Sequence, residues 1–293
     1  MAKLSHEIEY VCVRLGMALA RSLSASNADR LGRSLGAGAY RVLGSRRVIA
    51  ADNLHRALGP AINGGEIDGI VRSVFENIGR TVIELARIDL ATPQQVLRVV
   101  EPIKTDLPAK LLEQKSGALW ITAHFGNWEL LAYWACAAGY PLDIIMGEQH
   151  NPRINELLIE LRKATGVGVI STKGALRQVL KSLHGGRWVA MAADQHAPAG
   201  NLILDFFGRK ASVARGPAMF AIKADVPMVP VLLRRKSYDR HQVLFGDPVY
   251  PLKSGDIEQD VTVMTETYLR FLERMITRFP DQWAWTHRRW KVD

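Results

Sequence analysis

The spacing of apolar residues changes near Val96, and this change constrains the fold more than any other feature of the chain. Before this point, apolar residues recur at helical spacing, as in the long amphipathic pattern from Glu66 to Asp89. After it, short apolar runs alternate with helical stretches. The runs are Ala118–Ala123, Leu142–Met146, Gly166–Ile170, Trp188–Ala192, Met228–Leu233 and Gln242–Phe245, and the helical stretches are Trp128–Ala138, Pro152–Ala164, Ala175–Leu183, Val213–Lys223 and Ile257–Arg278. Strands that alternate with helices predict an α/β fold, with a mixed, largely parallel sheet covered by helices.

The chain therefore divides into two predicted parts. A helical N-terminal section covers residues 1–92 and packs on an α/β core that covers residues 93–293. The core contains a long loop from Asp194 to Ser212, rich in Pro, Gly and aromatic residues, and loops of this length are often functional. In the N-terminal section, Gly32-Arg33-Ser34-Leu35-Gly36 matches the nucleophile motif of serine hydrolases. That motif needs a strand and a sharp turn, whereas this segment lies in a helical pattern, so we predict a helix and no nucleophile.

The charge of the chain favours an anionic partner. The 293 residues carry a formal net charge of +9 and have a pI near 9.7. Nucleic acid is not indicated, because the chain has no recognition-helix, zinc-finger or RNA-recognition signature. Cys12 and Cys136 form no disulfide framework, and His150, His184 and His196 lack zinc-ligand spacing. We therefore expect no metal.

The first residues of the chain allow two interpretations. The apolar-rich stretch from Ile8 to Leu23 is interrupted by Glu9, Arg14 and Arg21. Its longest uncharged run is far shorter than the roughly 20 apolar residues that span a bilayer. No small-residue cleavage site follows a clean apolar core, so a signal peptide is not predicted. The stretch is either an amphipathic helix in the membrane interface or a helix packed on its own domain.

A histidine lies where the predicted sheet would bind a ligand. His124 follows the predicted strand Ala118–Ala123, and Trp128 begins a predicted helix after the turn residues Gly126 and Asn127. Ligands of open α/β sheets bind beyond the carboxyl ends of the strands. The first N–H groups of a helix are also suited to stabilise a developing oxyanion.

Glu129 follows His124 by five residues. On one continuous helix this spacing points the two side chains apart, but across a strand-to-helix turn it brings the carboxylate back towards the imidazole. In that arrangement Glu129 orients His124, and His124 removes the proton of an acceptor hydroxyl as its oxygen attacks a thioester. The spacing alone is a weak signal, because Glu is common in a first helical turn and a histidine at a strand end is often merely hydrogen-bonded.

Further motifs occur in a specific order. They are Asn53-Leu54, His124-Phe125-Gly126-Asn127-Trp128-Glu129, Asn151-Pro152, Lys173-Gly174, Ala193-Asp194-Gln195, Phe206-Phe207-Gly208, Gly216-Pro217, Val226-Pro227-Met228-Val229-Pro230-Val231 and Trp285-x-His287-Arg288-Arg289-Trp290-Lys291. From about residue 50 to the C-terminus, this order resembles the bacterial lipid A late acyltransferases, the lauroyl and myristoyl acyltransferases of the lysophospholipid acyltransferase superfamily. In the second motif, His124 and Glu129 match the family's H-x-x-x-x-D/E. In the fifth motif, Ala193 replaces the Pro of the family's P-D-Q/H segment.

The resemblance implies an activity. It is O-acyl transfer from acyl carrier protein to a hydroxyl of a lipid A precursor, with His124 as general base, Glu129 as its orienter and no metal or organic cofactor. The partners would be acyl carrier protein, an anionic lipid acceptor and the inner-membrane surface. The enzyme would be a peripheral or monotopic protein at the cytoplasmic face of that membrane, with residues 1–92 nearest to it.

Further residues are candidates for the site, from the motifs and from their positions in the predicted turns and loops. The substrate or oxyanion contacts would come from Gly126, Asn127, Arg153, Lys173, Asp194, Gln195, Arg288 and Arg289, and the acyl pocket from Trp128, Phe206 and Phe207. Other interpretations remain open. Asp194 and Gln195 end an apolar strand, so they either lie near His124 at the same edge of the sheet or cap a loop. Phe206 and Phe207 are also suited to form a small core, and the basic C-terminal residues to face solvent.

One departure from the family concerns a cation. Many members carry an Arg shortly before Asn-Pro, but here that stretch is Met146-Gly147-Glu148-Gln149-His150. Arg153 follows instead, either as a replacement or as a solvated residue of a first helical turn. A different acceptor, such as another phospholipid, glycolipid or aminolipid, is therefore an alternative. A non-catalytic lipid-binding membrane protein is an alternative of another class.

Overall fold

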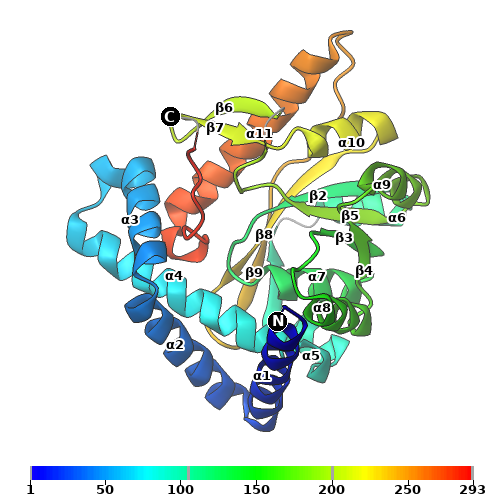
Figure 1. Ribbon diagram of the computed structural model, residues 1–293. Helices are drawn as coiled ribbons and strands as arrows, with labels where there is room; N and C mark the ends of the chain where they lie inside the picture. The colour runs from blue at the N-terminus through cyan, green and yellow to red at the C-terminus, as the bar shows by residue number, and fades with distance from the viewer. Residues whose placement is uncertain (1, 104–105, 199–200, 292–293) are drawn as a thin grey trace.

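A mixed seven-stranded sheet forms the centre of the protein. The computed structural model describes residues 2–103, 106–198 and 201–291 (Figure 1). The strand order is β1-β9-β8-β2-β5-β3-β4. The strands are β1 (Val100–Ile103), β2 (Ala118–Thr122), β3 (Leu142–Met146), β4 (Gly168–Ser171), β5 (Trp188–Ala192), β8 (Met228–Arg235) and β9 (His241–Phe245). The β8–β9 pair is antiparallel and the other pairs are parallel, which confirms the predicted fold class.

The central strand β2 shows how the sheet forms two cores. All five of its residues are buried, as expected for a strand with helices on both faces. Successive side chains of a strand point to opposite faces. Leu119 and Ile121 accordingly pack in one hydrophobic cluster, and Trp120 packs in the other.

Helices cover the two faces. The cluster around Trp120 includes residues of α5 (Pro93–Val99), α7 (Trp128–Ala137) and α8 (Pro152–Ala164). The cluster around Leu119 includes residues of α9 (Ala175–His184), α10 (Gly216–Ala224) and α11 (Ile257–Arg278). In Figure 1, α7 and α8 lie on the side of the sheet nearest α1, whereas α10 and α11 lie on the far side.

The N-terminal section consists of α1 (Ala2–Ser22), α2 (Ala25–Val42), α3 (Gly44–Leu58) and α4 (Gly64–Leu85), and a short helix η2 (Ile88–Leu90) follows. Buried residues of α3 and α4 belong to the same cluster as Leu119, so these helices share a hydrophobic core with one face of the sheet. The division into two domains at residue 92 stays a prediction.

Gly32 and Gly36 lie inside α2, where no strand or sharp turn is present. A Cβ atom on Gly36 would overlap the Phe75 carbonyl oxygen of α4, and one on Gly79 would overlap the Gly32 carbonyl oxygen. These glycines therefore let α2 and α4 pack closely, and the segment is not a nucleophile motif.

The segment predicted as a long loop from Asp194 to Ser212 contains two strands among its described residues. It contains the antiparallel hairpin of β6 (Leu202–Phe206) and β7 (Arg209–Val213), which turns through Phe207 and Gly208. Both turn residues have a positive φ, of 53° and 69°. Since Val213 ends β7, the following helix α10 begins at Gly216 and not at Val213. The remaining short elements are η1 (Gly59–Ala61), α6 (Asp106–Glu113) and η3 (Pro280–Gln282).

No helix among the described residues has both the length and the apolar character needed to cross a membrane.

Candidate active site

The turn that carries His124 is held from three sides. Gly126 has a φ of +57°, and a Cβ atom there would collide with the Leu233 carbonyl oxygen of β8. Its N–H donates to the Gln282 carbonyl at 2.8 Å. Its carbonyl accepts a hydrogen bond from the Thr81 hydroxyl of α4 at 3.2 Å. These contacts fix the path of the chain between β2 and α7, so His124 lies at the carboxyl edge of the sheet.

Asp194 is the hydrogen-bond partner of His124. The Nδ1–H of the imidazole donates to Oδ1 at 2.9 Å, and the backbone N–H of His124 donates to Oδ2 at 3.0 Å. The indole N–H of Trp283 also donates to Oδ2, at 2.8 Å. The carboxylate is almost completely buried, whereas the His124 side chain keeps 28% of its surface exposed. Three donors therefore hold one buried carboxylate against a histidine that a substrate can reach.

The strand register explains this pairing. Thr122 of β2 lies opposite Ala192 of β5 in a parallel ladder. His124 and Asp194 each lie two residues beyond that pair, one after each strand. Because parallel strands end at the same edge of a sheet, the two side chains meet there.

The pair changes the pKa of both groups. Burial raises the pKa of the Asp194 carboxyl, but the His124 charge and the hydrogen bonds from His124 and Trp283 outweigh this effect and lower it to about 2. Burial lowers the pKa of His124, but the charge and hydrogen bond of Asp194 outweigh it and raise the pKa above 6.5, with a smaller contribution from Glu129. Asp194 is thus ionised at neutral pH and can only accept from Nδ1. The basic lone pair of the imidazole is then on Nε2.

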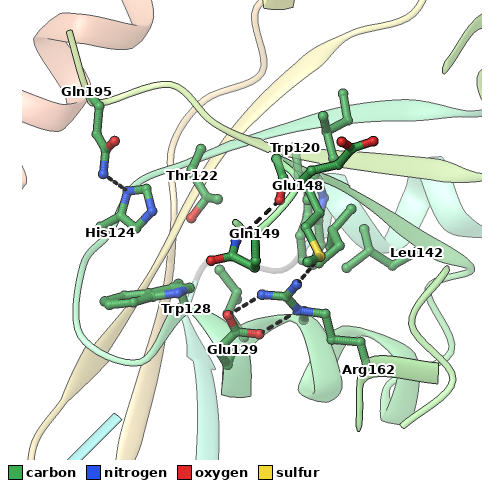
Figure 2. A pocket seen from close by; sticks show the side chains of 18 residues that line it. Trp120, Thr122, His124, Trp128, Glu129, Leu142, Glu148, Gln149, Arg162 and Gln195 are labelled. Atoms are coloured by element: carbon green, nitrogen blue, oxygen red, sulfur yellow. Dashed lines mark hydrogen bonds and ion pairs between the residues drawn. The ribbon is translucent and has the colours of Figure 1, made fainter. Parts of the chain in front are cut away.

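Glu129 has a different partner from the one predicted. Its carboxylate accepts two hydrogen bonds from Arg162, from Nε at 3.0 Å and from Nη2 at 2.7 Å. The structure gives no hydrogen bond between Glu129 and His124, whose ring is held by Asp194. The reason is that the first turn of α7 directs Glu129 towards α8, which carries Arg162. Figure 2 shows Trp128 between the imidazole and this ion pair.

Arg162 is the site residue that sequence reasoning missed. It lies four residues after Leu158 and eight after Ile154, in the half-buried stripe of α8. The sequence did contain a signal for Arg162, because a basic residue interrupts the apolar stripe of this helix. Arg153 does not take this position. Its guanidinium stacks on the Tyr10 ring at 3.9 Å and pairs with Glu7 of α1.

A cavity of about 390 Å³ connects His124 to the Glu129–Arg162 pair. Its polar part also includes Gln195, whose side-chain nitrogen lies 3.3 Å from His124 Nδ1. Thr122, Glu148 and Gln149 add further polar groups, and Trp120 and Leu142 are among its apolar walls (Figure 2). Trp128 lines it as well. The arrangement places the His124 imidazole at a cavity of the size of a small-molecule pocket.

Two predicted oxyanion donors have structural partners. The Gly126 N–H is bonded to Gln282, as described, and is not available for a substrate. The Asn127 side chain caps α7 by accepting from the Leu130 N–H at 2.9 Å and donates to Glu84 at 2.6 Å. Lys173 is exposed and pairs with Glu148, a residue that lines the cavity, at 2.6 Å.

Phe206 and Arg289, both predicted as site residues, do not line the cavity. Phe206 is fully buried and packs with Phe207, Trp283 and Trp290, which supports the small-core interpretation and not the acyl pocket. Arg289 is also buried, stacks on Phe206 at 4.8 Å and donates to the Ser212 carbonyl at 2.8 Å. It is therefore unable to contact a substrate phosphate, whereas Arg288 is exposed.

The two short Asn motifs connect segments that are distant in the sequence. Asn53 donates to the carbonyls of Trp285, at 2.8 Å, and His287, at 2.5 Å, and so fixes the C-terminal segment beside α3. Asn151 caps α8 and donates to the His6 carbonyl of α1 at 2.9 Å. Asn53 therefore holds the C-terminal segment in place, and Asn151 connects α8 to α1.

The fold and the site define an α/β protein in which a buried carboxylate holds a histidine beside a cavity lined by polar and apolar groups. The family model of bacterial lipid A biosynthesis acyltransferases matches residues 2–292, and the chain belongs to this family. The protein is accordingly an acyltransferase of lipid acceptors.

Individual relatives agree with this assignment. The lipid A biosynthesis lauroyltransferase of Escherichia coli is 26% identical over 266 residues, which are 90% of this chain and 85% of that protein. The phosphatidylinositol mannoside acyltransferase of Mycolicibacterium smegmatis is 23% identical over 234 residues, 77% of this chain and 74% of that protein. The enzyme of the same name from Mycobacterium tuberculosis is 23% identical over 252 residues, 82% of this chain and 76% of that protein.

Proposed function

We propose that this enzyme transfers a fatty acyl chain from acyl carrier protein to a hydroxyl of a lipid A precursor. The observation that carries the proposal is the Asp194–His124 hydrogen bond beside the cavity. It fixes the imidazole tautomer and leaves Nε2 as the base. Hydrogen-bonded Asp–His pairs perform this function in enzymes that transfer acyl groups through a hydroxyl nucleophile.

The reaction proceeds through a tetrahedral intermediate. Nε2 of His124 takes the proton of the acceptor hydroxyl as that oxygen forms a bond to the thioester carbon. The carbonyl electrons move onto the oxygen, then return as the C–S bond breaks. The departing sulfur takes the proton from the imidazolium, so the products are an ester and a free thiol. A general base contributes about 10²–10⁴ in rate, or roughly 3–5 kcal/mol of the barrier.

Arg162 supplies a positive charge at the same cavity. Its side chain is 13% exposed and its partner Glu129 is 7% exposed. The bidentate pair fixes the guanidinium, so that its remaining donors have a defined direction. In the proposed mechanism Arg162 stabilises the oxyanion, and Glu129 positions Arg162 while adding to the basicity of His124.

Specific observations also support a second candidate for the acceptor lipid. Two of the relatives are named for phosphatidylinositol mannoside, and the family's Arg before Asn-Pro is missing here. The second candidate is therefore transfer to another glycolipid by the same chemistry. The family match over residues 2–292 favours the lipid A precursor.

An exposed apolar stripe on α1 supports a membrane location at the cytoplasmic face of the inner membrane. Its residues are Leu4, Ile8, Val11, Leu15 and Leu19, which are between 50% and 67% exposed. They follow helical spacing, and the other side of α1 packs Tyr10, Val13 and Met17 against the core. An amphipathic helix of this kind binds in the membrane interface.

The test is mass spectrometry of lipid products from the purified enzyme. The reactions contain acyl carrier protein donors of mixed chain length and a panel of lipid A precursors, phospholipids and mannosylated lipids. His124→Ala should abolish transfer, whereas His184→Ala, a change of an exposed histidine on α9, should not alter it. Full turnover by His124→Ala would end the proposal, and a product formed only from another lipid would favour the second candidate.

A further inference from the structure

We infer that the outer side of α9 is the docking surface for an acidic carrier protein that brings the acyl thioester to the cavity. The α9 basic surface consists of Lys173, Arg177 and Lys181, with the exposed Leu176 between them. This inference rests on the proposed function, because it assigns a place to the donor of that reaction.

The α9 basic surface begins at the cavity. Lys173 lies in the turn between β4 and α9, and its Nζ is 2.6 Å from a carboxylate oxygen of Glu148, which lines the cavity. Arg177 and Lys181 follow on α9 itself. Residues four apart on a helix lie on the same side, about 5–6 Å from each other. Arg177 and Lys181 therefore form a row on one side of α9, and this helix starts at the Lys173 turn beside the cavity.

The two outer cations have no ionic partner of their own. Among the described residues, no carboxylate lies within ion-pair distance of Arg177 or Lys181. Two of the cations that line or flank the core are neutralised in contrast. Arg162 pairs with Glu129, and Arg235 pairs with Glu84. Arg177 and Lys181 thus carry unneutralised positive charge on an exposed helix that begins beside the cavity, where it attracts an acidic surface.

The inner side of α9 makes the row rigid. Val179 and Leu183 are buried in the same cluster as β2 and β5, and Gly174 begins the helix in the left-handed region with a φ of 68°. A fixed row of cations with one apolar side chain of 44% exposure suits an acidic helix of a partner protein. The partner stays outside, while its acyl chain and flexible arm enter the cavity.

The experiment compares two double charge reversals that change the net charge equally. The variant Arg177→Glu/Lys181→Glu alters the α9 basic surface. Arg274→Glu/Arg278→Glu alters exposed arginines four residues apart on α11, and each pair places one Glu in the last turn of its helix. Urea unfolding of both variants checks that the fold is intact.

Binding is measured without turnover, by fluorescence anisotropy of labelled dodecanoyl-acyl carrier protein. The α9 variant should bind about tenfold or more weakly, with a smaller dependence on salt, whereas the α11 variant should bind like the wild type. With an acceptor present, the α9 variant should show a higher KM for this donor and an unchanged kcat. Its kcat/KM for dodecanoyl-pantetheine should stay within about twofold of the wild-type value.

Three results would overturn the inference: unchanged binding by the α9 variant, equal losses in both variants, or an equal rise of KM for dodecanoyl-coenzyme A, which would make the row a phosphate site. Failure of the proposed function has a different signature. The wild type would then bind the carrier through α9 but transfer no acyl chain.

Discussion

Asp194 Oδ1 accepts a hydrogen bond from His124 Nδ1 at 2.9 Å, although 70 residues separate the two in the sequence. The parallel register of β2 and β5 brings them together, because each residue lies two positions beyond the paired Thr122 and Ala192. The tertiary fold, not local spacing, therefore sets the basicity of His124. This pairing makes the pH dependence of the reaction a test of the mechanism.

Asp194→Asn should slow acyl transfer by about 10²–10⁴-fold, because the amide neither fixes the tautomer nor stabilises the imidazolium. In the wild type the base is active only when neutral, so the rate should rise with pH through a pKa above 6.5. The substitution removes the charge that raises this pKa and leaves burial, which lowers it. The acidic limb of the kcat/KM profile should thus move to lower pH.

Asp143→Asn is the matched control. Asp143 is also a buried acid of the sheet, held by Arg187 at 2.6 Å and by Ser182. These contacts outweigh the effect of burial and lower its pKa. The control should lose stability at neutral pH but keep the wild-type acidic limb. An equal displacement of that limb in both variants would contradict the assignment of Asp194.

Trp283→Phe should reduce kcat by about tenfold and move the acidic limb slightly. It removes the indole donor to Asp194 Oδ2, and a hydrogen bond to a charged group contributes about 1.5–3 kcal/mol. Trp290→Phe removes a similar volume from the same aromatic cluster, yet the Trp290 Nε1 has no hydrogen-bond partner among the described residues. Steady-state kinetics should give a wild-type kcat for Trp290→Phe. An equal loss of kcat in both variants would mean that the loss comes from packing and not from the hydrogen bond to Asp194.

Gly126→Ala should destabilise the fold by more than about 3 kcal/mol, since the new methyl group meets the Leu233 carbonyl and the backbone φ is positive. Gly139→Ala isolates the second effect, because Gly139 also has a positive φ but no atom within 4 Å of an added Cβ. The Gly139→Ala substitution should lower the free energy of unfolding by only about 1 kcal/mol. Urea denaturation gives both values, and equal losses would show that the turn moves away from β8.

The sequence predicted the elements well where the apolar pattern was strong. The structure has β3, β5, α8 and α11 with the predicted bounds. It also predicted His124 at the end of β2. The hairpin of β6 and β7 was missed, because its turn at Phe207 and Gly208 left only short runs on either side.

The sequence predicted Asp194 at the same sheet edge as His124, but not the hydrogen bond between the two side chains. Which strand lies beside β2 is a property of the whole sheet, so spacing along the chain favoured Glu129 over Asp194 as the neighbour of His124. The same limit applies to Arg162, whose position in the stripe of α8 matters only because Glu129 faces it. Phe206 and Arg289 were recognised as belonging to motifs, but their burial depends on the C-terminal segment that packs over them.

Ile8→Ser/Leu15→Ser should weaken binding to anionic phospholipid vesicles. Both side chains belong to the exposed stripe of α1, at 58% and 66% exposure, and each full burial of such a group contributes about 1.5–3 kcal/mol. We expect about a tenfold or greater loss of affinity in co-sedimentation, with the fold unchanged because neither residue packs on the core. Tyr250→Ser/Ile257→Ser is the control, since these residues are 53% and 54% exposed but lie outside α1. If both variants lose affinity equally, general surface hydrophobicity and not α1 attaches the enzyme to the membrane; if neither does, α1 has no part in the attachment.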